Sequence, residues 1–120
     1  MEALKSVLHA RSSSGDFYEV QFHIDETKTR IFCHCPAGVM QQMCKHKLAL
    51  IKGDTTMLFY ASQAAELKRI VDSPVFSKVL MRLGRYESEL LAIEKEKALI
   101  LKREKETKST FGRELTAGVS

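Results

Sequence analysis

Three cysteines and two histidines lie within fourteen consecutive residues of this 120-residue chain. Cys33 and Cys35 form a C-x-C pair, and eight residues later Cys44 and His46 form a C-x-H pair. Zinc prefers four tetrahedral ligands of thiolate sulfur and imidazole nitrogen, and a Cys₃His set fills all four positions. Because the chain has no other cysteine, we predict that these four residues bind one structural Zn²⁺ ion.

Such a site needs chain elements that bring the two pairs together. A strand should end at Cys33, because side chains two residues apart in a plain strand run parallel instead of converging on one ion. Pro36 and Gly38 suit a curl after Cys35, since Pro fixes φ and Gly tolerates positive φ. The apolar run after His46 predicts a helix that begins at the second pair.

Two alternatives compete with this interpretation. The cysteines could simply be buried apolar residues, although two C-x-[CH] pairs this close together are typical of a metal site. His9, His23 and His34 are rival fourth ligands. We expect them to be solvated on or beside the strands, which leaves His46 as the favoured ligand.

The motif resembles the SWIM zinc-finger family over roughly residues 5–52. The resemblance rests on Cys35-Pro36-Ala37, on residues 44–49 (Cys-Lys-His-Lys-Leu-Ala), and on residues 17–22, which resemble the family's first-hairpin strand. It implies a β-hairpin leading into the first pair, a helix leaving the second, and contacts to DNA or proteins. The family's Gly-x-Pro before the third ligand is replaced by Gln42-Met43, so this loop should curl differently.

The N-terminal part predicts an antiparallel sheet with one apolar face. Tyr18, Val20, Phe22 and Ile24 alternate with polar residues, residues 25–28 supply a turn, and residues 29–33 return as a strand. Residues 1–11 fit a helix or a strand, and we choose a strand over 5–11 because the sheet needs a partner. The predicted fold class is α+β: a small zinc-stapled antiparallel hairpin or meander plus a helix (ββα-like), followed by a helical extension.

The C-terminal part predicts helices. Gly53 and Asp54 are a helix stop and restart signal, and we expect helices over 57–71, 74–83 and 85–107. The last one carries a heptad-like apolar seam. We divide the chain into a zinc-finger domain (1–53), a helical extension with this seam (54–107) and a flexible tail (108–120). The seam consists of Leu83, Tyr86, Leu90, Ile93, Lys97 and Ile100.

Composition sets limits on function. The formal charge of +4 permits a nucleic-acid partner without demanding one. No apolar run approaches the ~20 residues that cross a bilayer, and no signal peptide is recognisable. Reduced thiols indicate an intracellular compartment, cytoplasmic or nuclear. A closed Cys₃His site leaves no place for a catalytic water, and no nucleophile or phosphate-binding motif occurs, so we expect neither an enzyme nor a small-molecule substrate.

Two binding functions remain. In the first, the module contacts nucleic acid, or a protein complex associated with nucleic acid, and four basic residues on the finger helix and its neighbouring strand contact the nucleic acid. In the second, zinc is purely structural and residues 83–101 bind a protein partner or form a homodimer. Salt separates them, because phosphate binding weakens steeply as salt rises while an apolar helix interface hardly changes. We expect Tyr18 and Phe22 to be buried and therefore not to stack on bases. The four basic residues are Arg30, Lys45, Lys47 and Lys52.

Overall fold

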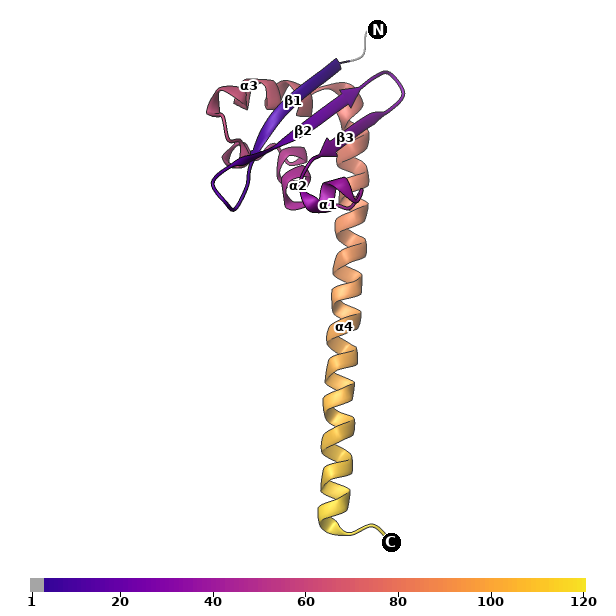
Figure 1. Cartoon of the computed structure of the whole chain (residues 1–120). Helices are drawn as coiled ribbons and strands as arrows, with labels where there is room; N and C mark the ends of the chain where they lie inside the picture. The colour runs from indigo at the N-terminus through magenta and orange to yellow at the C-terminus, as the bar shows by residue number, and fades with distance from the viewer. Residues whose placement is uncertain (1–3) are drawn as a thin grey trace. The chain divides into compact units, whose positions relative to one another are not determined.

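A computed structural model describes residues 4–120 and has the predicted α+β fold (Figure 1). A three-stranded antiparallel sheet of order β1-β2-β3 is followed by helices. The strand predicted over residues 5–11 is confirmed, and residues 1–3 lie outside the described part of the chain. The elements are β1 (Leu4–Arg11), β2 (Phe17–Ile24), β3 (Thr29–Cys33), α1 (Pro36–Val39), α2 (Lys45–Ile51), α3 (Ala64–Val71) and α4 (Ser77–Ala117).

The register of the sheet separates an inner face from an outer face. Val20 of β2 lies opposite Leu8 of β1 on one side and opposite Cys33 of β3 on the other. All three residues are buried, and successive side chains alternate between the faces. The inner face therefore carries the core and also delivers the first cysteine of the motif. Its fully or nearly buried strand residues are Leu8, Ala10, Val20, Phe22, Ile24 and Cys33.

The turn between β2 and β3 is stabilised by Asp25. Its carboxylate accepts hydrogen bonds from the backbone N–H groups of Thr27 (2.8 Å) and Lys28 (2.9 Å). The Lys28 and Thr27 backbone N–H groups lower the pKa of this carboxyl group, because they favour its charged form. The Asp-Glu-Thr-Lys segment thus forms the reversal that the sequence predicts.

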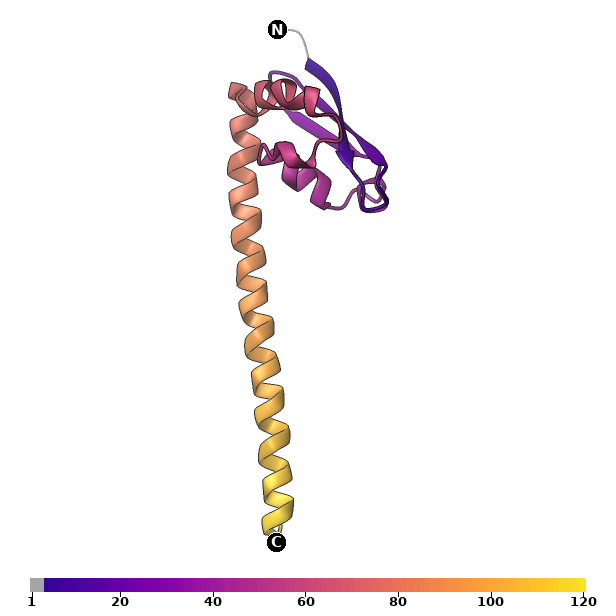
Figure 2. The same cartoon turned by 90° about the vertical axis from the view of Figure 1, so that its left-hand side faces the viewer.

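Helices cover the inner face of the sheet. Figure 2 shows α2 and α3 on the same side of the three strands. Burial of these apolar side chains against the sheet is the main favourable term for the fold of this part of the chain. The buried residues outside the strands include Leu50 and Ile51 of α2, Leu67 and Ile70 of α3, and Leu58 and Phe76 of the connections.

The prediction of one continuous helix over residues 57–71 is wrong. Short 3₁₀ turns occupy Thr55–Met57 and Ala61–Gln63, and the regular helix begins only at Ala64. Between the turns, Leu58 forms an antiparallel bridge with Ala10, and the Phe59 N–H donates to the His9 carbonyl at 2.8 Å. Pairing with the edge of β1 outweighs the helical pattern of this segment.

Close contacts divide the chain into two units, Met1–Arg82 and Leu83–Ser120. Gly53, the first domain boundary expected from the sequence, lies inside the first of these units, and residues that follow it, such as Leu67 and Ile70, are buried.

α4 is one uninterrupted helix of 41 residues, about 60 Å long. It passes through Gly84 and includes residues 108–117, which the sequence analysis assigned to a flexible tail. The apolar pattern fades there, but no Pro interrupts the helix and Lys108 forms an ion pair with Glu104 at 2.9 Å. Among residues 4–120, no helix is both long and apolar enough to cross a membrane.

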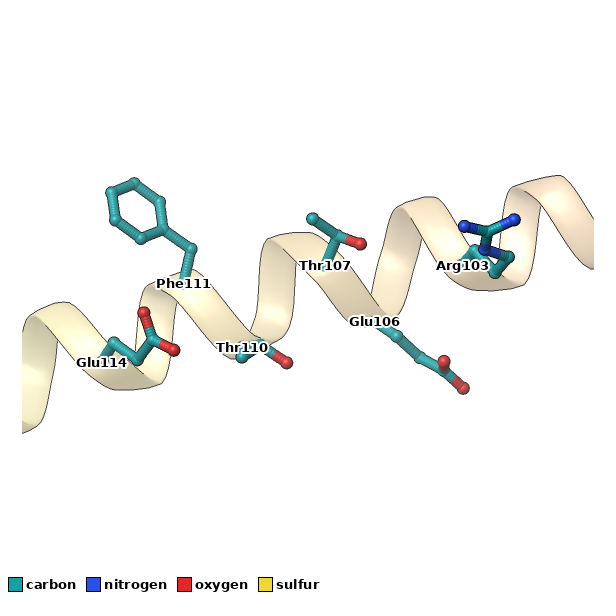
Figure 3. A pocket seen from close by; sticks show the side chains of 6 residues that line it. All are labelled: Arg103, Glu106, Thr107, Thr110, Phe111 and Glu114. Atoms are coloured by element: carbon teal, nitrogen blue, oxygen red, sulfur yellow. The ribbon is translucent and has the colours of Figure 1, made fainter.

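The C-terminal part of α4 carries charged, polar and aromatic side chains along a surface pocket. Figure 3 shows six of them projecting from a single stretch of helix: Arg103, Glu106, Thr107, Thr110, Phe111 and Glu114.

Candidate metal centre

The structure brings the four predicted ligands together. The Sγ atoms of Cys33, Cys35 and Cys44 and a ring nitrogen of His46 all lie within 4.8 Å of one another. Zinc bound at about 2.3 Å from tetrahedral thiolates would hold the sulfurs roughly 3.8 Å apart. The cluster would therefore contract by about 1 Å at most, so this arrangement can hold one metal ion.

α1 positions Cys35. This residue is the N-cap of α1, and its Sγ accepts a hydrogen bond from the Gly38 backbone N–H at 3.3 Å. The helix then ends in a tight C-terminal motif, with Gln41 in the left-handed region (φ 59°). The backbone N–H groups of Gln41 and Gln42 donate to the carbonyls of Gly38 and Ala37. The curl expected after the first pair is therefore a one-turn helix with defined caps.

α2 positions Cys44 and His46 in the same manner. Cys44 is the N-cap of α2, and its Sγ accepts from the Lys47 backbone N–H at 3.4 Å. A cysteine sulfur takes the place that an Asp or Ser oxygen usually holds at a helix N-cap. Both C-x-[CH] pairs thus use a cysteine to cap the helix that follows, which fixes two of the three sulfurs against backbone donors.

His46 gives the strongest structural sign of a ligand. The residue is 4% exposed, and both ring nitrogens are buried without a hydrogen-bond partner in the described structure. Burial and the nearby Lys45 charge lower the pKa of His46, and the Arg11 backbone carbonyl opposes them, although it does not reach hydrogen-bond geometry. A buried imidazole without partners is costly, and coordination to a metal ion would remove that cost.

The thiols differ in their environments. Burial raises the pKa of Cys33 to about 12. Burial also acts to raise the pKa of Cys35, but the Gly38 backbone N–H and the Cys33 and Cys44 thiols outweigh it and lower this pKa. The donor set combines soft sulfur with neutral imidazole, and this chemistry fits zinc or another thiophilic metal ion.

The other histidines lie away from this cluster. His34 is exposed, and its Nδ1 lies 3.9 Å from a Glu19 carboxylate oxygen. His9 bonds with the side-chain amide of Gln63, and the His23 ring lies edge-on to Phe32.

The four basic residues named from the sequence do not form one cluster. Arg30 is exposed and lies opposite His23 on the outer face of the sheet. Lys45 borders a hollow beside Cys44, and Lys47 borders a different one beside Phe32. Lys52 is exposed at the C-terminal end of α2.

Of the two aromatic residues expected to be buried, Phe22 is buried and Tyr18 is only half-buried. Tyr18 covers His46 with ring centroids 5.2 Å apart. Phe32, which the sequence analysis did not single out, is 45% exposed. The sequence could have indicated its position, because successive residues of a strand face opposite sides and Phe32 precedes the inward-facing Cys33.

No protein-family model, curated protein or solved structure matches the chain when it is compared with known proteins. What the structure shows by itself is a small α+β fold whose Cys₃His cluster can hold one metal ion.

Proposed function

We propose that the chain is a non-catalytic, zinc-stapled interaction module of the SWIM type that contacts nucleic acid. The observation that carries the zinc assignment is the buried, partnerless His46 imidazole among three sulfurs. Four ligands would leave zinc no open position, and the ion would supply folding free energy rather than chemistry. Its role is to hold β3, α1 and α2 together.

The nucleic-acid part of the proposal is supported by the distribution of charge. Arg30 and Lys45 are exposed and Lys47 is half-buried on elements that the metal centre fixes. Basic side chains on rigid elements suit contacts to phosphate, which position a module on nucleic acid without reading its sequence. The overall charge of +4 is compatible with this partner.

Two measurements test the proposal together. Native mass spectrometry should find one zinc per chain, and chelator should unfold the Met1–Arg82 unit. Titration with labelled nucleic acid at rising salt should show a steep loss of affinity, with about one log unit per contacted phosphate for each log unit of salt. A zinc-free folded chain, or binding that is indifferent to salt, would contradict the proposal.

A second candidate function is a protein adaptor that uses α4. Beyond Leu83 the helix exposes large apolar side chains, which are unusual on a surface that binds nothing. They include Leu90 (42% exposed), Ile93 (45%) and Ile100 (62%). A helical partner protein would bury them.

A second copy of the chain suits this seam poorly. In a parallel, in-register pair, Lys97 would face its own copy at a core position, and Glu89 would lie beside Glu94 of the other chain. Both relationships are repulsive, so a different protein helix fits the seam better than self-pairing does. Sedimentation of the purified chain tests this point, and a stable dimer at micromolar concentration would contradict it.

A further inference from the structure

The outer face of the sheet carries an aromatic ring that the core does not use. Phe32 is 45% exposed and lies opposite Gln21 in the β2–β3 register. Its ring lies nearly edge-on to the His23 ring, with 5.3 Å between centroids. Within Met1–Arg82, α2 and α3 lie on the opposite face of the sheet (Figures 1 and 2). Phe32 is therefore an accessible aromatic surface on a rigid strand.

Phe32 also borders a hollow in the surface. The hollow measures about 580 Å³ and lies between the outer face of β2 and β3, the turn of α1 and the start of α2. This size falls within the range of about 300–1,000 Å³ that is usual for ligand sites. Its rim combines one aromatic ring with amide, imidazole and ammonium groups from Gln21, His23, Gln41 and Lys47.

The charges around this face favour an anionic ligand. Lys47 lines the hollow, Arg30 lies two residues before Phe32 on the same face, and Lys5 is opposite His23 from the β1 side.

Two acidic side chains near this face have partners of their own. The Glu19 carboxylate lies 3.9 Å from His34, and the Asp25 carboxylate accepts from Thr27 and Lys28 within its own turn. Both carboxylates keep their charge, and the basic side chains that line the hollow or share the outer face of β3 with Phe32 are Lys47 and Arg30.

We propose that this hollow binds an unpaired nucleotide of a single-stranded nucleic acid. The base stacks on Phe32, and the flanking phosphates contact Lys47 and Arg30. An aromatic platform beside basic groups is the combination that single strands need, because each base has an apolar face and each linkage a charge. A base inside a duplex could not reach the ring. The inference rests on the proposed nucleic-acid function and adds the strand state and the contacting residue.

The test measures fluorescence anisotropy of the zinc-loaded full chain. The probes are labelled oligothymidine and oligouridine of about ten nucleotides, together with a duplex of the same length. Both single strands carry the required chemistry, and their affinity ratio identifies whether the deoxy or the ribo form is preferred. We expect at least one single strand to bind more tightly than the duplex.

Substitution of Phe32 gives the decisive comparison. Phe32→Ala should weaken single-strand binding roughly 5- to 150-fold, while Phe32→Tyr retains it. Val7→Ala is the matched control, because Val7 is 46% exposed on the same face but lies outside the hollow. Zinc content and thermal stability of Phe32→Ala should equal those of the unmodified chain, which separates a lost contact from a lost fold.

The outcomes distinguish this inference from the function on which it rests. If Phe32→Ala binds normally while Lys45→Gln combined with Lys52→Gln abolishes binding, the chain contacts nucleic acid elsewhere and the Phe32 site is wrong. Duplex binding as tight as single-strand binding overturns the inference in the same way. If the unmodified chain binds none of the three probes, the nucleic-acid function fails together with it.

Discussion

Gly38 packs directly against Cys33: a Cβ atom at position 38 would lie 2.8 Å from both the carbonyl carbon and the Cβ of Cys33. Real Cβ atoms do not approach so closely, so any side chain here would separate α1 from the end of β3. These two elements carry the first two sulfurs of the cluster. The geometry of the metal centre therefore depends on the absence of a side chain at a residue that is not a ligand.

Gly38→Ala should weaken metal binding and destabilise the Met1–Arg82 unit by about 2 kcal/mol or more, because the added methyl group displaces backbone. Competition with a chromophoric zinc chelator measures the first effect, and urea unfolding the second. Gly112→Ala is the control, since nothing lies within 4 Å of a Cβ there and the change should favour α4 by about 0.5–1 kcal/mol. Equal behaviour of the two variants would show that the close approach has no energetic consequence.

Replacing His46 with Ala should unfold the Met1–Arg82 unit at neutral pH, because the lost ligand removes much of the folding free energy that a structural metal supplies. Amide exchange of β1–β3 in the presence of zinc gives the measurement, and Cys44→Ser should behave alike. His34→Ala serves as the matched control, since His34 is exposed and outside the cluster. If the strand amides of the His46 variant stay protected from exchange in the presence of chelator, the structural-metal assignment is wrong.

Glu66 should give a pH-dependent contribution to stability. The Arg69 guanidinium and the Ser6 hydroxyl hydrogen-bond to this carboxyl group and lower its pKa from the usual 4.5. A carboxyl pKa that is lower in the folded state stabilises that state at any pH above the pKa of the unfolded chain. The stabilisation is lost as the pH falls through the pKa of the folded state. The free energy of unfolding of the unmodified chain should exceed that of Glu66→Gln by about 0.5–1 kcal/mol at neutral pH.

This advantage should stay constant from pH 7 to about pH 5 and shrink only below the unfolded value near 4.5. Paired urea denaturation of the two chains at each pH measures it, with zinc in equal excess. A difference that stays constant below pH 4.5, or that grows as the pH falls, would show that the carboxyl pKa is not lowered.

Lys97→Leu should convert α4 into a self-associating helix. Lys97 is the polar residue between Ile93 and Ile100 in the seam, and a leucine there removes the like-charge pair that opposes two parallel copies. Sedimentation equilibrium should find the unmodified chain monomeric and the variant dimeric at micromolar concentration. Lys95→Leu, outside the seam, is the control, and equal association of both variants would show that general apolarity and not the seam is responsible.

The sequence predicted the metal centre well because its geometry is local. Residues 33–46 span the end of one strand and the starts of two helices. Both the spacing and the types of the four ligand residues therefore indicate that their side chains converge. The alternation of Val20, Phe22 and Ile24 likewise predicted which face of the sheet is buried, because a half-buried strand repeats every two residues.

The remaining features depend on distant partners. Leu58 pairs with Ala10 across the fold, and nothing near Leu58 in the sequence indicates that pairing, so a helix was expected there instead. The extension of α4 beyond Thr107 was missed for another reason. An exposed helix needs no apolar stripe. Helix propensity and ion pairs such as that of Lys108 with Glu104 stabilise it, and they leave only a weak pattern in the sequence.

The bridge between Ala10 and Leu58 has a consequence for the lifetime of the chain. It ties the segment before α3 to β1, and β1 is paired in turn with β2 and β3, where the first cysteine lies. With zinc bound as proposed, loss of the ion would therefore release α3 along with the strands, although α3 carries no ligand. In a zinc-starved environment the whole Met1–Arg82 unit would then become a substrate for proteases, so metal supply would set the abundance of the chain as well as its shape.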